Sequence, residues 1–270
     1  MRIAAAIGLL VFCGAARAQH PLDEEQTKLV EDARSAALEY SSSLPDFLCT
    51  ERIVRREDPR NDNRWRPLDT LTVRLSYLDH RENYKLIAID GKPTQVEYLA
   101  IGGALTTGEF GSRLIALFTP ESKAVFEWKG WAQLHGRRVA VLHYRIAQEN
   151  STFLVGEGPG DPKGKNTIVA GYRGEVSIDE ETRRVLRLTA MAELPAGFAI
   201  RESTATVEYD FRKVGGKQFL VPVSADAGMR RGNYKSENHV EFRDYRKFQG
   251  ESTISFENLD EKAKAPPDKK

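Results

Sequence analysis

Few residues in this sequence have the type and spacing that catalysis or metal binding requires. The five histidines are His20, His80, His135, His143 and His239. No two of them are spaced as His-x-His or His-x-x-x-His, the local arrangements typical of metal sites. The sequence also has no Gly-x-Ser-x-Gly elbow that would present a serine nucleophile. We therefore nominate no catalytic residue, no metal ligand and no cofactor.

Residues 156–165 (GEGPGDPKGK) resemble a phosphate-binding loop only superficially. Pro159 stands where that motif requires glycine, and Asn166 follows the Gly-Lys pair where serine or threonine is needed. No helical pattern follows, so the backbone donors of a helix N-terminus are missing. We interpret this stretch as a surface loop.

The charges are balanced, with 40 Lys+Arg against 39 Asp+Glu and a formal net charge of +1. Basic pairs such as Arg230-Arg231 are interleaved with acids, whereas nucleic-acid-binding proteins gather a basic excess on one face. We expect no nucleic-acid partner. Carboxylate pairs such as Glu180-Glu181 suit solvated turns. A hydrolase with carboxylates from separate strands stays an open alternative, because sequence spacing does not reveal such a pair.

Residues 1–18 have the three parts of a secretory signal peptide. Arg2 precedes an apolar run over 3–15, and Ala16-Arg17-Ala18 fits the cleavage pattern. We expect cleavage after Ala18 and a periplasmic or secreted location. The apolar run is too short to span a bilayer, and no later stretch approaches about 20 apolar residues. The mature chain is therefore expected to have no transmembrane span.

Cleavage leaves a single cysteine, Cys49, because Cys13 lies inside the removed segment. One cysteine cannot form an internal disulfide, so the fold must depend on its apolar core. No histidine lies near Cys49 in the sequence, and we interpret it as a small buried residue rather than a nucleophile.

One segment has helical periodicity. Within 23–43, apolar residues recur at helical spacing, acids occupy the first turn, and a serine run with Pro45 ends the pattern. The apolar positions are Leu29, Val30, Ala33, Ala36, Ala37 and Tyr40. We assign 19–47 to an N-terminal helical region.

After this helix the periodicity changes to two. Apolar and polar residues alternate in 70–77, 139–146 and 204–211, as in antiparallel strands with one buried face. Short turns join such runs, and Asp90-Gly91 favours a tight hairpin between an apolar run and 95–98. About nine strands are expected.

The fold class that follows is mainly β (α+β). We expect a large curved antiparallel sheet or half-open β-barrel, with the N-terminal helix and a short helical plug. This domain covers 48–258, and 259–270 is expected to be a disordered tail.

An apolar segment at 99–120 breaks the strand pattern with glycines, and 112–118 can form a short helix. Three large aromatic residues, Phe126, Trp128 and Trp131, follow it closely in the sequence. A packed core plug and a lid over a ligand cavity are both compatible with this pattern, and space beneath the segment decides between them. The residues that we expect to line or gate such a cavity are Leu105, Phe110, Leu114, Phe118, Phe126, Trp128 and Trp131.

The layout resembles the periplasmic lipoprotein-carrier superfamily, the LolA/LolB-type carriers and RseB-type sensor domains. The shared features are the signal peptide, the N-terminal helix, the meander with its apolar helical interruption, and the stretch 171–179 with Thr182, which is similar to that group's Ile-Asp-x-x-Thr turn. The resemblance implies a half-open barrel closed by helices over an apolar cavity, without enzymatic activity. This chain differs in its longer loops at 57–67 and 156–165.

We therefore expect an exported, soluble, non-catalytic protein that binds a hydrophobic ligand: an acyl chain, a lipid or a lipoprotein. The alternative is an envelope module that binds another protein and has a fully packed interior. An exported hydrolase is the third hypothesis.

Overall fold

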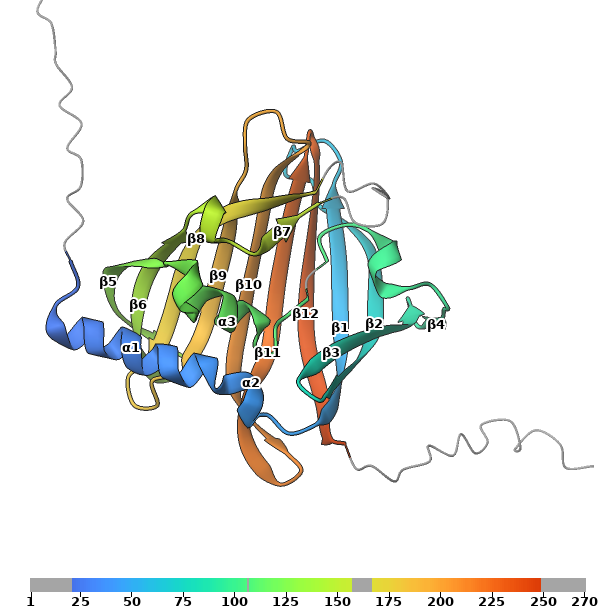
Figure 1. Cartoon of the computed structure of the whole chain (residues 1–270). Helices are drawn as coiled ribbons and strands as arrows, with labels where there is room; N and C mark the ends of the chain where they lie inside the picture. Colours follow the sequence, from blue (N-terminus) through green and yellow to red (C-terminus); the bar gives the residue numbers. More distant parts are fainter. Residues whose placement is uncertain (1–20, 106, 157–166, 249–270) are drawn as a thin grey trace, which may run out of the picture.

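The computed structural model describes residues 21–105, 107–156 and 167–248 (Figure 1). The expected signal peptide at 1–18 and the expected tail at 259–270 lie outside the described residues, as does most of the loop at 156–165. The domain expected over 48–258 is described up to residue 248.

The predicted N-terminal helix is confirmed as α1 (Glu24–Leu38) and α2 (Tyr40–Ser43). Asp23 caps α1: its carboxylate accepts the N–H of Gln26 at 2.8 Å, and the Gln26 side chain accepts the N–H of Asp23 at 3.1 Å. This reciprocal arrangement satisfies backbone donors that the helix itself leaves free. The buried face of α1 consists of Leu29, Val30, Ala33 and Ala37.

The described residues form twelve strands, and every pair of neighbours is antiparallel. They are β1 (Phe47–Asp58), β2 (Arg66–Leu78), β3 (Arg81–Ile89), β4 (Lys92–Pro93), β5 (Val125–Leu134), β6 (Arg137–Ile146), β7 (Phe153–Val155), β8 (Ile168–Asp179), β9 (Val185–Glu193), β10 (Ile200–Val214), β11 (Lys217–Arg231) and β12 (Tyr234–Lys247). The count exceeds the nine expected partly because β4 and β7 are too short to give an alternating pattern.

The remaining elements are the helix α3 (Ser112–Phe118) and three short 3-10 helices, η1 (Tyr98–Ile101), η2 (Pro120–Ser122) and η3 (Gln148–Asn150). The short helix predicted over 112–118 is therefore confirmed.

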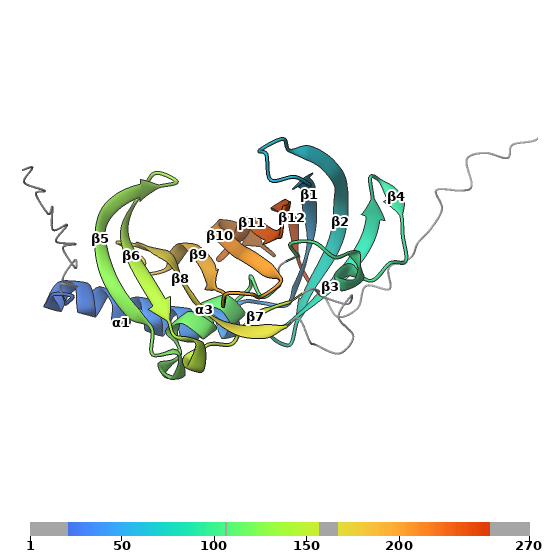
Figure 2. The ribbon, with the colours of Figure 1, turned by 90° about the horizontal axis from the view of Figure 1, so that it is seen from above.

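The strands form one sheet in the order β4-β3-β2-β1-β12-β11-β10-β9-β8-β6-β5, and β7 pairs with β8 beside this path. The first strand β1 lies next to the last strand β12, which joins the two meanders of the chain. The edge strands β4 and β5 do not pair with each other, so the sheet is open. Figure 2 shows its strong curvature. The predicted large, curved antiparallel sheet is confirmed.

The sheet has an inner face, toward the helices, and a solvent-exposed outer face. In Figure 1, α1, α2 and α3 lie on the same side of the sheet. The alternation predicted for 70–77 is confirmed, because Leu71, Val73 and Leu75 are completely buried in the core. On the outer face, ion pairs such as Arg187–Glu208 at 2.5 Å link neighbouring strands.

The hairpin at Asp90-Gly91 is only partly as expected. Both residues have positive φ, 49° and 74°, as a tight turn requires. The strand expected at 95–98 is wrong, since β4 ends at Pro93 and Tyr98 begins η1. Because Pro93 has no N–H to donate, it cannot extend the ladder of hydrogen bonds at this edge of the sheet.

Candidate functional site

The order of the strands forces one segment to cross the inner face of the sheet. Because β4 and β5 are the opposite edges, residues 94–124 must pass from one edge to the other. Figure 1 shows α3, part of this connection, in front of the middle strands. The apolar segment at 99–120 therefore departs from the strand pattern because it covers the sheet.

Residues 102–105 and 107–111, which we name the strap, are hydrogen-bonded to the sheet through their backbone. At the start, Arg55 on β1 donates from Nη1 to the carbonyl of Gly102 at 2.9 Å. Asn238 on β12 donates from Nδ2 to the carbonyl of Ala104 at 2.6 Å. Both side chains are buried. Buried polar groups of this kind hold a loop that has no ladder partners of its own.

The end of the strap is fixed by Glu82 and Tyr209. The Glu82 carboxylate accepts the N–H of Gly108 at 2.9 Å and that of Phe110 at 3.1 Å. The hydroxyl of Tyr209, on the middle strand β10, donates to the carbonyl of Glu109 at 2.9 Å. Hydrogen bonds that backbone N–H groups donate to a carboxylate are charge-assisted and among the stronger ones in proteins.

The strap ends at Gly111, where only glycine fits. Its φ is 134°, and an added Cβ would lie 2.9 Å from Cβ of Ser41. This close approach brings the start of α3 against α2.

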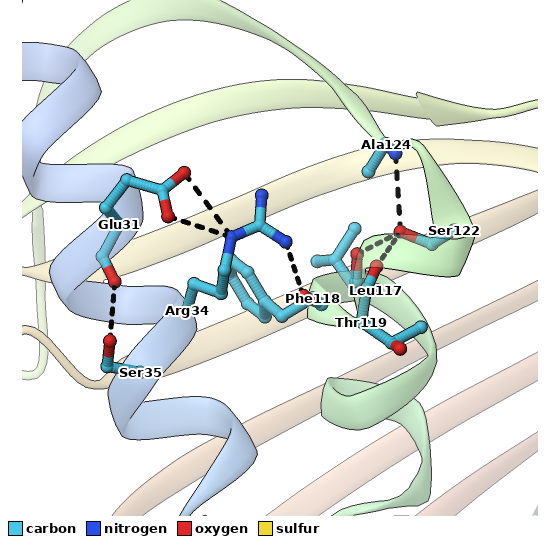
Figure 3. Close-up of polar contacts among 8 residues, drawn as sticks. All are labelled: Glu31, Arg34, Ser35, Leu117, Phe118, Thr119, Ser122 and Ala124. Atoms are coloured by element: carbon cyan, nitrogen blue, oxygen red, sulfur yellow. Dashed lines mark hydrogen bonds and ion pairs between the residues drawn. The ribbon is translucent and has the colours of Figure 1, made fainter.

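Helix α3 is anchored at its C-terminal end against α1 (Figure 3). Arg34 on α1 is oriented by Glu31 and donates from Nη1 to the carbonyl of Phe118 at 2.5 Å. The buried hydroxyl of Ser122 donates to the carbonyl of Leu117 at 2.8 Å. These bonds satisfy carbonyls that the end of a short helix leaves without partners.

Beneath the strap and α3, a partly open cavity of about 360 Å³ remains. Its floor is the inner face of the middle strands, and β7 provides another wall. The floor is lined by Tyr144, Tyr172, Leu188, Ala190, Ala205, Val207, Ala227 and Met229. The volume is within the range of roughly 300–1,000 Å³ that is usual for ligand sites. Space is therefore left beneath the segment, which is the feature that distinguishes a lid from a packed plug.

The described lining combines apolar residues with polar ones, among them Thr107, Ser112, Thr152, Ser203 and Thr204. Its one charged side chain is Arg113 on α3. The hydroxyl of Tyr144 is already used, since it donates to the carbonyl of Thr189 at 2.6 Å. Burial raises the pKa of Tyr172 to about 12, so its hydroxyl stays protonated. The described lining contains no carboxylate, thiol or imidazole.

The seven residues expected to line a cavity lie in different environments in the structure. Leu105, in the strap, lines the cavity described above. Phe110, Leu114 and Phe118 are buried in the core, where Phe110 packs on Phe47 with ring centroids 5.1 Å apart.

The three aromatic residues of β5 lie near the edge of the sheet. Phe126 and Trp128 are partly buried against the core, and Phe126 stacks on Phe118 at 5.8 Å. A bulge between Trp128 and Gly130 changes the register, and Trp131 contacts Trp128 edge-on while remaining 40% exposed.

Sequence reasoning missed Arg113 and the small residues of the floor. Ala190, Ala205 and Ala227 come from three adjacent strands, and their small volumes leave the space. The sequence does show small residues on the apolar faces of several strands. Only the strand register shows that these residues are neighbours and leave a space.

A second buried polar cluster was also missed. Glu51 on β1, Glu82 on β3 and Glu109 in the strap lie around Tyr84, whose hydroxyl donates to Oε2 of Glu109 at 2.9 Å. Burial raises the pKa of Glu51 well above its ordinary range, and the charges of Glu109 and Glu82 add to this. Burial also raises the pKa of Glu82. None of the three lines the cavity described above.

Within the part of the chain that the structure describes, no group of three or more histidine, cysteine, aspartate or glutamate side chains is arranged to hold a metal ion. Cys49 is buried, as predicted, and burial raises the pKa of its thiol. None of the described helices is long and apolar enough to cross a membrane.

No protein-family model matches this sequence, and no curated protein matches it. Several solved structures are similar in fold. A DUF1329 family protein from Desulfovibrio piger has 9% identity and a TM-score of 0.39, covering 83% of this chain and 95% of that chain. A putative outer membrane lipoprotein-sorting protein domain from Vibrio parahaemolyticus has 14% identity and a TM-score of 0.38, covering 84% and 95%.

A LolA superfamily protein from Nitrosomonas europaea has 12% identity and a TM-score of 0.33, covering 83% of this chain and 93% of that chain. A LolA superfamily protein is thus among the solved structures that are similar to this chain. Because these TM-scores are below 0.5, we draw no conclusion about ligand, partner or activity from them.

Proposed function

We propose that this chain is an exported, non-catalytic binding protein that holds a hydrophobic ligand, such as the acyl chain of a lipid or lipoprotein, in the cavity beneath the strap and α3. The observation that carries this proposal is the cavity of about 360 Å³, whose floor is formed largely by apolar side chains. A ligand that buries about 200 Å² of apolar surface there would gain on the order of 5 kcal/mol before the costs of ordering.

The arrangement of the cover supports the same proposal. The strap and α3 are held by specific hydrogen bonds from Arg55, Asn238, Glu82 and Arg34. These bonds hold the cover above the floor although the space below it is not filled by side chains. A module with a fully packed interior has no need of this arrangement.

The cavity also favours binding over hydrolysis. The three carboxylates that converge from separate elements, Glu51, Glu82 and Glu109, surround Tyr84 and lie outside the described lining. General acid–base catalysis needs such a group within hydrogen-bond reach of the substrate.

A cavity-filling substitution tests the proposal. Ala205→Phe places a ring into the floor, and Thr206→Phe places the same ring on the opposite face of the same strand. The probe is N-phenyl-1-naphthylamine, a neutral hydrophobic fluorophore. We expect the wild type and Thr206→Phe to bind it, and Ala205→Phe to bind it at least about tenfold more weakly.

Ala227→Phe, on the neighbouring strand β11, repeats the test at a second floor position and decides the matter if Ala205→Phe does not fold. Absence of binding by the folded wild type would overturn the proposal. So would unchanged binding by a folded cavity-filled variant.

Export is the second part of the proposal, and it depends on residues 1–18. Expression of the full chain in a bacterial host, followed by intact-mass measurement of the periplasmic fraction, tests it. The expected product begins at Gln19; a full-length product confined to the cytoplasm would contradict export.

A further inference from the structure

We infer that the ligand of this cavity is an amphiphile with a single apolar chain and an anionic head, and that Arg113 together with the hydroxyl of Tyr172 binds that head. The inference rests on the proposed function, since it assigns the chemical class of the ligand in the same cavity.

Arg113 is a cation without a counter-ion. It is the one charged side chain in the described lining of the cavity. Its guanidinium forms no hydrogen bond or ion pair with any residue that the structure describes, and its Nε is completely buried without a partner. Its guanidinium carbon lies 5.9 Å from the centroid of the Phe153 ring on β7.

An unpaired guanidinium beside this cavity costs free energy unless an anion is bound. The guanidinium group presents several N–H donors in a plane, a geometry that matches a carboxylate or a phosphate. An anionic head at Arg113 would therefore complete the hydrogen bonding that the protein alone leaves unfinished.

Tyr172 provides a second donor beside Arg113. Its ring lies 5.1 Å from the ring of Phe153, and the positive charge of Arg113 acts on its hydroxyl. The Tyr172 hydroxyl has no hydrogen-bond partner among the described residues, in contrast to that of Tyr144, which is bound to Thr189.

The nearest acid along the chain, Glu109, is engaged elsewhere through one carboxylate oxygen, whereas its Oε1 is buried without a hydrogen-bond partner. Its Oε2 accepts the hydroxyl of Tyr84, and its carbonyl accepts the hydroxyl of Tyr209. It forms no ion pair with Arg113 within 4.0 Å. Glu109 does not line the cavity, so an anion that enters the cavity meets Arg113 without a competing carboxylate in the lining.

Part of the described lining is apolar. It includes Val155 on β7 and Ile200 and Met229 on β10 and β11, which belong to or pack against one small apolar cluster. An extended chain with its head at Arg113 would place its tail against these residues.

The test compares head groups on the same chain. Dodecanoate, dodecyl phosphate, dodecanol and dodecyltrimethylammonium are each used to displace N-phenyl-1-naphthylamine at neutral pH. We expect the wild type to bind the two anions at least about tenfold more tightly than dodecanol, and the cation most weakly. Inorganic phosphate alone is expected not to displace the probe, because it lacks the chain.

Arg113→Met should remove this preference while changing the affinity for dodecanol by less than about twofold. Arg113→Lys should retain part of the preference. The matched control is Arg74→Met, which removes one positive charge from an exposed position on β2. It should leave the head-group preference intact.

Equal binding of dodecanoate and dodecanol by the wild type would overturn the inference, and so would a preference that survives in Arg113→Met. If Arg113→Met does not fold, the wild-type head-group series and Arg113→Lys decide. Binding of the neutral probe without head-group preference refutes this inference alone, whereas failure to bind any probe refutes the proposed function.

Discussion

The carboxylate of Glu82 accepts the backbone N–H of Phe110 at 3.1 Å, which joins the β2–β3 hairpin to the strap over the cavity. The side chain of Phe110 is buried among aromatic rings next to this bond. One contact thus fixes both the backbone of the cover and an aromatic anchor of the core.

Glu82→Ala should loosen the strap locally. It removes the acceptor of two N–H groups, those of Gly108 and Phe110. We expect hydrogen–deuterium exchange of the peptide containing Phe110 to become at least about tenfold faster, since each unmade buried hydrogen bond costs about 1–3 kcal/mol. Arg81→Ala, at the exposed neighbouring position, should leave this exchange unchanged. Equal exchange in both variants would show that Glu82 does not hold the strap.

The stability should fall as the pH rises above the ordinary range of carboxylic acids. Burial raises the pKa of Glu51 and of Glu82 above their ordinary value of 4.5. A group with a raised pKa binds its proton more tightly in the folded state, so its contribution is full below about pH 4.5 and is lost as the pH rises. Glu51 faces the carboxylates of Glu109 and Glu82, which strengthen this effect.

Glu51→Gln removes one of these charges and should flatten the pH dependence. We expect its free energy of unfolding in urea to exceed that of the wild type by about 1 kcal/mol or more at pH values near 8, and the difference to shrink toward pH 5. Glu181→Gln, at an exposed turn position, serves as the control and should behave like the wild type. If the free energy of unfolding had the same pH dependence in the wild type and in Glu51→Gln, this account of the buried cluster would be contradicted.

The anchor of α3 gives a third prediction. Ser122→Ala removes a buried hydroxyl that bonds the carbonyl of Leu117, and Arg34→Met removes the donor to Phe118. Each should lower the free energy of unfolding by about 1–3 kcal/mol. Ser35→Ala removes an exposed hydroxyl from the same helix as Arg34 and should cost less than about 0.5 kcal/mol. Thermal or urea unfolding measures the stability of all three variants. Equal losses in the free energy of unfolding would contradict the role of Ser122 and Arg34 in anchoring α3.

Cys49 should be inert in the folded protein. Its side chain is buried and the raised pKa of its thiol keeps it protonated, whereas the thiolate is the reactive form. We expect no reaction with Ellman's reagent until the chain is unfolded. Glu181→Cys supplies an exposed thiol as the positive control. Rapid modification of Cys49 in the native protein would contradict its placement in the core.

Much of the fold was predictable because local patterns carry it. The periodicity of 23–43 predicted the helix, and the alternation in 70–77 predicted which side chains of β2 are buried. The apolar segment with glycines fits neither strand nor long helix, and the sequence left a core plug and a lid as alternatives for it.

The details of the cavity were not predictable from these patterns. Arg113 and Tyr172 are distant in sequence and meet only because residues 94–124 cross the sheet between its two edges. Periodicity gives the face on which a residue lies, but not which strands are neighbours. The tryptophans of β5 were grouped with the apolar segment because they follow it in sequence, although β5 is an edge strand of the sheet.

Native mass spectrometry of the full chain, purified without detergent and then offered dodecanoate, tests the central claim most directly. We predict one bound amphiphile per chain in the wild type and in Thr206→Phe, and its loss in Ala205→Phe, whose added ring fills the floor of the cavity. A wild-type chain that carries no ligand after purification and takes up none when it is offered would contradict the claim that this fold encloses a binding site.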